Sequence, residues 1–221
     1  MAKEKISPTQ RALNLWAIVL IIWAVYRSKF NFFPPEIDEF IAKPLVFILP
    51  VWYYIKHYEN GKFFDRLDLH RKTLKTDIVY GLGIGAIFFG SAVLAQLVGK
   101  GKVIFLQGKS FSPETVGLMV VMAIATAISE EILSRGFILK RLYEESKNVW
   151  SASFLASILF FFLHVPILFG DPKINGNMLL IFLVTDMILS LTNSFIFLWR
   201  KSLVLPILIH ALYSLAIIFF L

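Results

Sequence analysis

The chain contains no cysteine among its 221 residues. This absence excludes disulfides, thiolate nucleophiles and cysteine-ligated metals, so histidine and carboxylate side chains would have to hold any metal. Histidine is also scarce, with four copies, and charged residues make up 17% of the chain. Acid, base or metal chemistry is therefore confined to few positions.

Hydrophobic residues, in contrast, make up 57% of the chain, and the mean hydropathy is +0.72. A helix needs about 20 residues to cross a bilayer, so the last five apolar stretches are long enough and the first two are marginal. We predict an all-α, polytopic bundle of transmembrane helices with about seven spans, within a range of six to eight. The stretches are residues 12–26, 41–55, 78–98, 116–139, 149–169, 178–199 and 203–221.

The distribution of lysine and arginine predicts the orientation. With seven spans and the N-terminus in the cytoplasm, 14 basic residues lie on the cytoplasmic side and 7 on the other, where Lys43 is counted. The positive-inside rule then favours this orientation. The net charge of +7 is thus explained by topology and lipid headgroups, and we expect no nucleic-acid partner. No small-residue cleavage site follows the first apolar run, so we expect a retained multi-pass protein, in the cell membrane.

Two regions of one membrane domain are expected. Residues 1–66 form N-terminal anchor spans and a basic cytoplasmic loop, and residues 67–221 form the helical core that carries the chemistry. The polar interval 56–77 is expected to touch lipid headgroups. Gly81 and Gly85, four residues apart in an apolar run, predict close helix packing, because no Gly-Lys-Ser/Thr follows that would indicate a phosphate loop.

Glu130 and Glu131 lie side by side in the apolar run 116–139. An ionisable group within a membrane costs about 2.5–3.5 kcal/mol and is usually paired, hydrated or functional. Counting about 1.5 Å per residue from the basic residues at 140–141 and 200–201 places Glu130 and His210 roughly 13–15 Å deep. The antiparallel return of the next span brings His164 to the same level. We therefore predict that these side chains converge from three helices.

The charge pattern suggests different tasks for the two carboxylates. Glu131 and Arg135 are four residues apart in the favourable order for a helical ion pair, which leaves Glu130 as the better candidate base. Two imidazoles and a carboxylate also match the ligand set of a catalytic zinc site with one open position. No His-Glu-x-x-His motif is present, and the spacing does not decide between Zn²⁺ bound by Glu130, His164 and His210 and a metal-free site.

Three segments resemble motifs of the CPBP family, the intramembrane proteases related to the type II CAAX prenyl endopeptidase. Residues 130–135 resemble Glu-Glu-x-x-x-Arg, residues 160–164 resemble Phe-x-x-x-His, and residues 202–210 resemble the third motif. The resemblance covers about residues 67–214. It implies hydrolysis of a peptide bond by an activated water, in a membrane-associated peptide or protein that enters from the cytoplasm or the bilayer.

The resemblance also implies residue roles. Glu130 would activate the water, His164 would hold the water or its metal, and His210 would ligate the metal or stabilise the oxyanion. Glu131, counted with the catalytic group, and Arg135 would form a supporting pair.

One position departs from the family pattern. Ser214 lies where family members commonly have an asparagine that resembles an oxyanion donor, and Asn193 is a candidate substitute if its helix faces the site. Asp186 is expected to form a helix–helix hydrogen bond.

Two other functions remain open at this point. A catalytically weak or inactive relative could bind a membrane partner or act as an immunity protein, and Ser214 motivates this alternative. A proton or ion transporter could use buried Glu, His and Asp side chains as a relay, although we find no inverted repeat.

Overall fold

The computed structural model describes residues 6–30, 32–69, 73–108, 110–170 and 176–220. These residues form helices and connecting turns, and no strand occurs among them. The helices are α1 (Pro8–Lys29), α2 (Pro35–Ile37), η1 (Asp38–Ala42), η2 (Pro44–Ile48), α3 (Leu49–Tyr58), α4 (Phe63–Arg66), α5 (Leu74–Lys100), η3 (Phe105–Gly108), α6 (Pro113–Glu131), η4 (Ile132–Leu139), α7 (Lys140–Ser146), α8 (Val149–Gly170), α9 (Gly176–Arg200) and α10 (Val204–Phe220).

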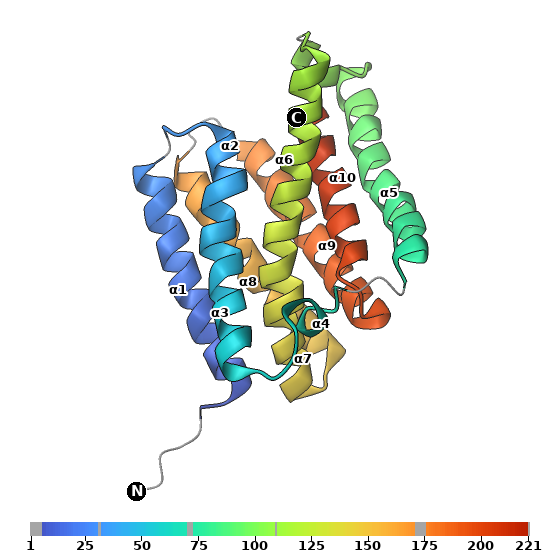
Figure 1. The fold of residues 1–221 in the computed structure, drawn as a ribbon. Coiled ribbons are helices and arrows are strands. Elements are labelled where there is room, and N and C mark those ends of the chain that lie inside the picture. The colour runs from blue at the N-terminus through green and yellow to red at the C-terminus, as the bar shows by residue number, and fades with distance from the viewer. Residues whose placement is uncertain (1–5, 31, 70–72, 109, 171–175, 221) are drawn as a thin grey trace, which may run out of the picture.

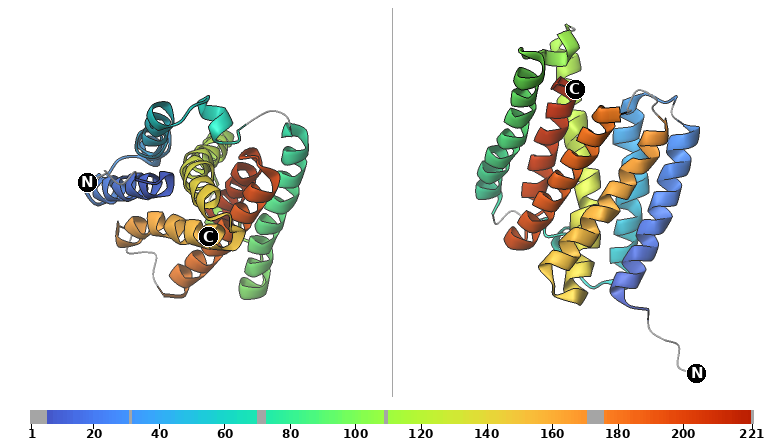
Figure 2. Two further views of the ribbon diagram at one scale, coloured as in Figure 1. Left: turned by 90° about the horizontal axis from the view of Figure 1, so that it is seen from below. Right: turned by 180° about the vertical axis from the view of Figure 1, so that it is seen from behind.

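The long helices stand side by side as an up-and-down bundle (Figure 1). The start of α1, the short helix α4, α7 and the α9–α10 turn lie at one end, and α2 and the end of α10 lie at the other. Seen from below, the continuous run from α6 through α7 occupies the middle, and α5 lies at the edge against α10 (Figure 2). The residues that end α6 are thus surrounded by other helices.

Four helical segments of the described chain are long and apolar enough to cross a membrane, and α10 is a shorter apolar helix. Their outer faces carry large apolar side chains, such as Ile87 and Val98, which are 70% and 80% exposed. Such surfaces suit a lipid environment rather than water. The prediction of an all-helical integral membrane protein is confirmed, whereas the number of about seven spans stays a prediction. The spans are Pro8–Lys29, Leu74–Lys100, Pro113–Ser146 and Val149–Pro166.

The second apolar stretch is helical but irregular. Pro44 has no N–H group to donate, so a regular α-helical ladder is interrupted there. The chain instead widens into the two π-helical segments η1 and η2 before it continues as α3. Lys43 lies between these segments and is 6% exposed. The earlier placement of Lys43 among the outer charges is therefore wrong, because the helix turns it into the bundle.

Gly81 and Gly85 pack α5 closely against α10, as predicted. A Cβ atom built on Gly81 would lie 2.8 Å from Cβ of Leu208, and one on Gly85 would lie 2.9 Å from Cβ of Leu212. Real Cβ atoms do not approach so closely, so the close approach of these two helices needs glycine at both positions. Gly83, on the same helix, has open space around it.

Both predicted regions contribute to one hydrophobic core. Trp23 and Phe47 from the first 66 residues belong to the same buried cluster as Phe137 and Leu203. The boundary at residue 66 stays a prediction.

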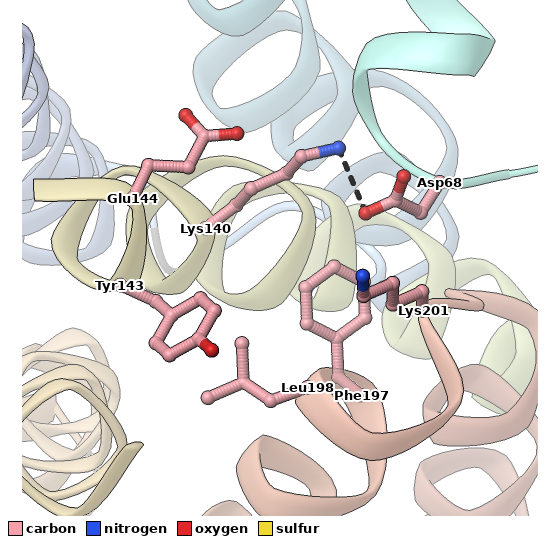
Figure 3. A pocket seen from close by; sticks show the side chains of 7 residues that line it. All are labelled: Asp68, Lys140, Tyr143, Glu144, Phe197, Leu198 and Lys201. Carbon is pink, nitrogen blue, oxygen red and sulfur yellow. Dashed lines mark ion pairs between the residues drawn. The ribbon is translucent and has the colours of Figure 1, made fainter. Parts of the chain in front are cut away.

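The polar interval after α3 is tied to the end of the bundle that carries α7. Asp68 accepts an ion pair from Lys140 at 2.7 Å, and its carbonyl oxygen accepts the backbone N–H of Leu203 at 3.0 Å. Figure 3 shows this ion pair at the rim of a small pocket, with Tyr143 and Lys201 nearby. Contact with headgroups stays a prediction.

Candidate active site

The site begins where α6 changes into a wider helix. Glu130 and Glu131 are the last residues of α6, and the π-helical segment η4 follows at once. The two carboxylates are 5% and 0% exposed, in the middle of the bundle. π-Helical turns are rare and occur often at functional sites, because the inserted residue re-aims neighbouring side chains. The pair therefore lies on a helix with a local change of pitch, inside a shell of other helices.

Two histidines from separate helices approach the same oxygen of Glu130. The Nε2 atom of His164, on α8, lies 3.5 Å from Oε2 of Glu130, and Nε2 of His210, on α10, lies 3.6 Å from it. Within the described chain, this Oε2 atom has no hydrogen-bond partner. The structure thus brings together the three side chains that sequence analysis placed at one depth.

Glu131 accepts hydrogen bonds from three donors on a single oxygen atom. Its Oε1 accepts from Nη1 of Arg135 at 3.0 Å, from Nδ2 of Asn193 at 3.1 Å and from Nδ1 of His210 at 2.8 Å. A carboxylate that receives several donors is held in one position and orients each donor in return. Because Nδ1 of His210 donates to Glu131, its Nε2 is directed towards Glu130.

Arg135 is held by further contacts. Its Nη2 donates to the carbonyl oxygen and the hydroxyl of Ser190 on α9, at 3.1 and 2.7 Å. Its guanidinium carbon lies 4.3 Å from the ring centroid of Phe160, and that ring meets the rings of His164 and His210 edge-on. The arginine and the phenylalanine of the first two motifs therefore pack together behind the histidines.

Lys43 is a site residue that sequence analysis missed. Its Nζ atom lies 2.9 Å from Oε1 of Glu130 and 2.8 Å from Oε1 of Glu39, and Thr126 on α6 bonds the other oxygen of Glu39. Glu130 is therefore paired with Lys43 through Oε1. We call its Oε2 open because this buried atom makes no hydrogen bond in the described chain. A signal was present in the sequence, because Lys43 is a charged residue inside an apolar stretch, four residues after an acidic one.

Three further candidates take different places. Oδ2 of Asp186, on α9, lies 3.6 Å from Nδ1 of His164 on α8 and has no hydrogen-bond partner in the described chain, so the helix–helix hydrogen bond stays a prediction. Asn193 faces the site, but its Nδ2 donates to both Glu131 and the carbonyl oxygen of Pro206, so both N–H donors are used. Ser214 lies on α10, four residues after His210, and is half-buried.

These residues do not fit a metal ion as they stand. No group of three or more His, Asp or Glu side chains among the described residues is arranged to hold one. In addition, the ammonium of Lys43 already supplies a positive charge 2.9 Å from Glu130. Zinc stays a prediction from the types of ligand present.

Comparison with known proteins agrees with the three motifs. The family model for Rce1-like type II CAAX prenyl endopeptidases matches residues 112–216, a range that starts later than the resemblance over residues 67–214. No match was found among curated proteins or among solved structures. The matched range contains Glu130, Glu131, His164 and His210, and it leaves out Lys43. Residues 112–216 therefore match an Rce1-like type II CAAX prenyl endopeptidase domain, and this match supports the assignment to the CPBP family of membrane peptidases.

Proposed function

We propose that this protein is an integral-membrane endopeptidase in which Glu130 activates a water molecule to cleave a peptide bond. One observation carries the proposal: the open Oε2 of Glu130 lies within 3.6 Å of Nε2 atoms from two different helices. Buried carboxylate and imidazole groups at such distances are typical of general acid–base sites. The matching family model supports the same class of reaction.

In this mechanism, a water molecule lies against Oε2 of Glu130. Glu130 takes a proton while the water oxygen adds to the carbonyl carbon of the scissile bond. The negative charge that develops on the carbonyl oxygen faces Nε2 of His164 or His210. Because Nδ1 of each ring donates to another acceptor, Nε2 stabilises this charge when the ring is protonated on both nitrogens. Glu130 then returns the proton to the amide nitrogen, the C–N bond breaks, and a carboxylic acid and an amine leave.

Glu131 and Arg135 have a positioning role in this proposal. Glu131 directs His210 through Nδ1, and Arg135 neutralises Glu131 in a site that excludes bulk water. Asn193 holds Glu131 and has no side-chain N–H left for an oxyanion. It therefore does not replace the asparagine that family members have at the position of Ser214.

The substrate is a membrane-associated peptide or protein that reaches the site from the cytoplasm or the bilayer, in a protein that resides in the cell membrane. A carboxylate and two histidines act on the peptide bond itself. They therefore do not determine which side chains flank that bond in the substrate.

A partner-binding relative without strong activity is the second candidate. Ser214 favours it, because a serine hydroxyl reaches less far than the amide of the family's asparagine at this position. Substitution of Glu130 separates the two functions, since a scaffold does not depend on a general base.

The decisive experiment is cleavage of a peptide library by the purified full-length protein. We expect that Glu130→Gln, which keeps the size of the side chain but removes the base, lowers kcat by at least about 100-fold. Glu114→Gln is the matched control, because Glu114 is exposed in the first turn of the same helix. Metal content of the same samples tests the zinc prediction.

Unchanged cleavage by Glu130→Gln would remove Glu130 from the mechanism. Proton uptake into liposomes that is lost in His164→Ala, together with no peptide cleavage by the wild type, would establish a transporter instead.

A further inference from the structure

A fixed positive charge reaches the site from outside the region that the family model matches. Lys43 lies between η1 and η2, and its ammonium bridges Glu39 on the same helical run and Glu130 on α6. Family membership rests on residues 112–216 and says nothing about this contact. The geometry of this contact indicates its role.

Stability alone is a poor explanation for this ion pair. The attraction within a buried ion pair offsets little more than the free energy needed to remove its two charges from solvent. An apolar residue of similar volume often stabilises the fold as well. The cost is greater still in a lipid-surrounded bundle. A lysine buried at this position therefore needs a reason other than packing.

No other lysine or arginine in the described part of the chain forms an ion pair with Glu130. The guanidinium of Arg135 binds Glu131 and Ser190 instead. Among the lysines and arginines that the structure describes, Lys43 alone pairs with Glu130, at the oxygen that the two histidines do not approach.

The contact divides the two oxygens of the carboxylate between two tasks. Lys43 binds Oε1, and because a carboxylate is planar, this restricts the direction of Oε2. Oε2 is the atom near both Nε2 atoms, at 3.5 and 3.6 Å. Glu39 in turn restrains Lys43, since it binds the ammonium at 2.8 Å and is itself bonded by Thr126.

We propose that Lys43 is a positioning residue for the hydrolysis, which aims the open oxygen of Glu130 at the attacking water, and that Glu39 acts through Lys43. This inference rests on the proposed peptidase function. It makes the second helical run part of the catalytic unit rather than only a membrane anchor.

The test compares Lys43→Met with Lys43→Arg in the full-length protein. Methionine keeps the length and flexibility of the side chain without its charge, and arginine keeps a cation. We expect Lys43→Met to lower kcat by about 100-fold, the effect of a small misplacement of a catalytic group, with KM within threefold. We expect kcat of Lys43→Arg to be at least tenfold higher than kcat of Lys43→Met. The matched control is Lys56→Met, an exposed lysine on the same helical run that should keep wild-type kcat.

Glu39→Gln covers the case in which Lys43→Met folds poorly, and where Lys43→Met folds, the two variants form a double-mutant cycle. Glu39→Gln keeps the Lys43–Glu130 pair but weakens its restraint, so we expect a loss in kcat of about tenfold. If Glu39 acts through Lys43, Glu39→Gln should cause no further loss in the Lys43→Met protein.

Wild-type kcat in both Lys43→Met and Glu39→Gln, with Glu130→Gln inactive, would overturn the role of Lys43 and leave the proposed function intact. Additive losses in the cycle, or no recovery with arginine, would also overturn it. A wild-type protein that cleaves no peptide would instead contradict the proposed function itself.

Discussion

Single atoms explain how two adjacent carboxylates can differ. Glu131 has three donors on Oε1, and Glu130 has one lysine on Oε1 and two histidines near Oε2. Oε2 of either carboxylate is buried without a hydrogen-bond partner in the described chain, but only Oε2 of Glu130 lies close to Nε2 atoms from two other helices. Adjacent residues on a helix point about 100° apart, so each reaches a different set of helices.

The residue scale predicts a large cost for removing Arg135. Arg135→Met leaves the fully buried Glu131 without its cation, and breaking a buried pair in this way costs about 3–5 kcal/mol. We expect the free energy of unfolding in detergent, measured by steric trapping, to fall by this amount.

Arg66→Met is the control for this prediction. Its ion pair with Glu59 is 3.4 Å long and part-exposed, so the expected cost is below about 1 kcal/mol. Equal losses in the two variants would show that the Arg135–Glu131 pair does not hold the site.

At the scale of elements, irregular helices bring the site together. η1 and η2 flank Lys43, and η4 follows Glu131, so both partners of the Lys43–Glu130 pair lie beside π-helical turns. In a π-helix, each residue advances by a smaller angle than in an α-helix, which shifts the direction of every later side chain. The change of pitch can therefore turn polar side chains towards the interior of the bundle while the helix keeps its place in it.

The packing of α5 on α10 gives a second prediction. Gly81→Ala places a Cβ atom 2.8 Å from Cβ of Leu208, so the helices must separate, at a cost of about 1–3 kcal/mol. Gly83→Ala meets no atom within 4 Å and gains the better helix propensity of alanine, up to about 1 kcal/mol. We expect opposite shifts of the thermal unfolding midpoint in these two variants, and shifts of the same sign would contradict the packing argument.

At the scale of the whole molecule, the two ends of the bundle differ in charge. The end that carries α7 and the α9–α10 turn holds the basic residues at 140–141 and 200–201 (Figure 1). Since Lys43 lies inside the bundle, it no longer counts among the seven basic residues that the sequence placed on the opposite side. The correction agrees with the predicted orientation, in which the α7 end faces the cytoplasm.

The natural absence of cysteine makes this orientation simple to test. Ser146 ends α7 and Ser110 precedes α6 at the opposite end, and both are exposed. We expect a membrane-impermeant maleimide to label Ser110→Cys in intact cells and Ser146→Cys only after permeabilisation. The reverse pattern would invert the topology, and the wild type, which has no thiol, measures the background.

Much of this protein was predictable because it depends on local properties of the chain. Hydropathy and length along the sequence indicate a helical membrane protein, since a bilayer imposes the same requirement on each span. Counting along helices placed Glu130, His164 and His210 at one depth, and the four-residue spacing predicted the Glu131–Arg135 pair. The glycines of α5 likewise predicted close packing.

The tertiary structure alone decided which side chains meet. Depth can be counted along a helix, but the direction of a side chain depends on how each helix is rotated in the bundle, and the π-helical segments change that rotation. Lys43 was therefore counted outside, whereas it lies against Glu130. The same rotation commits both N–H donors of Asn193 and leaves one oxygen of Glu130 open between two histidines.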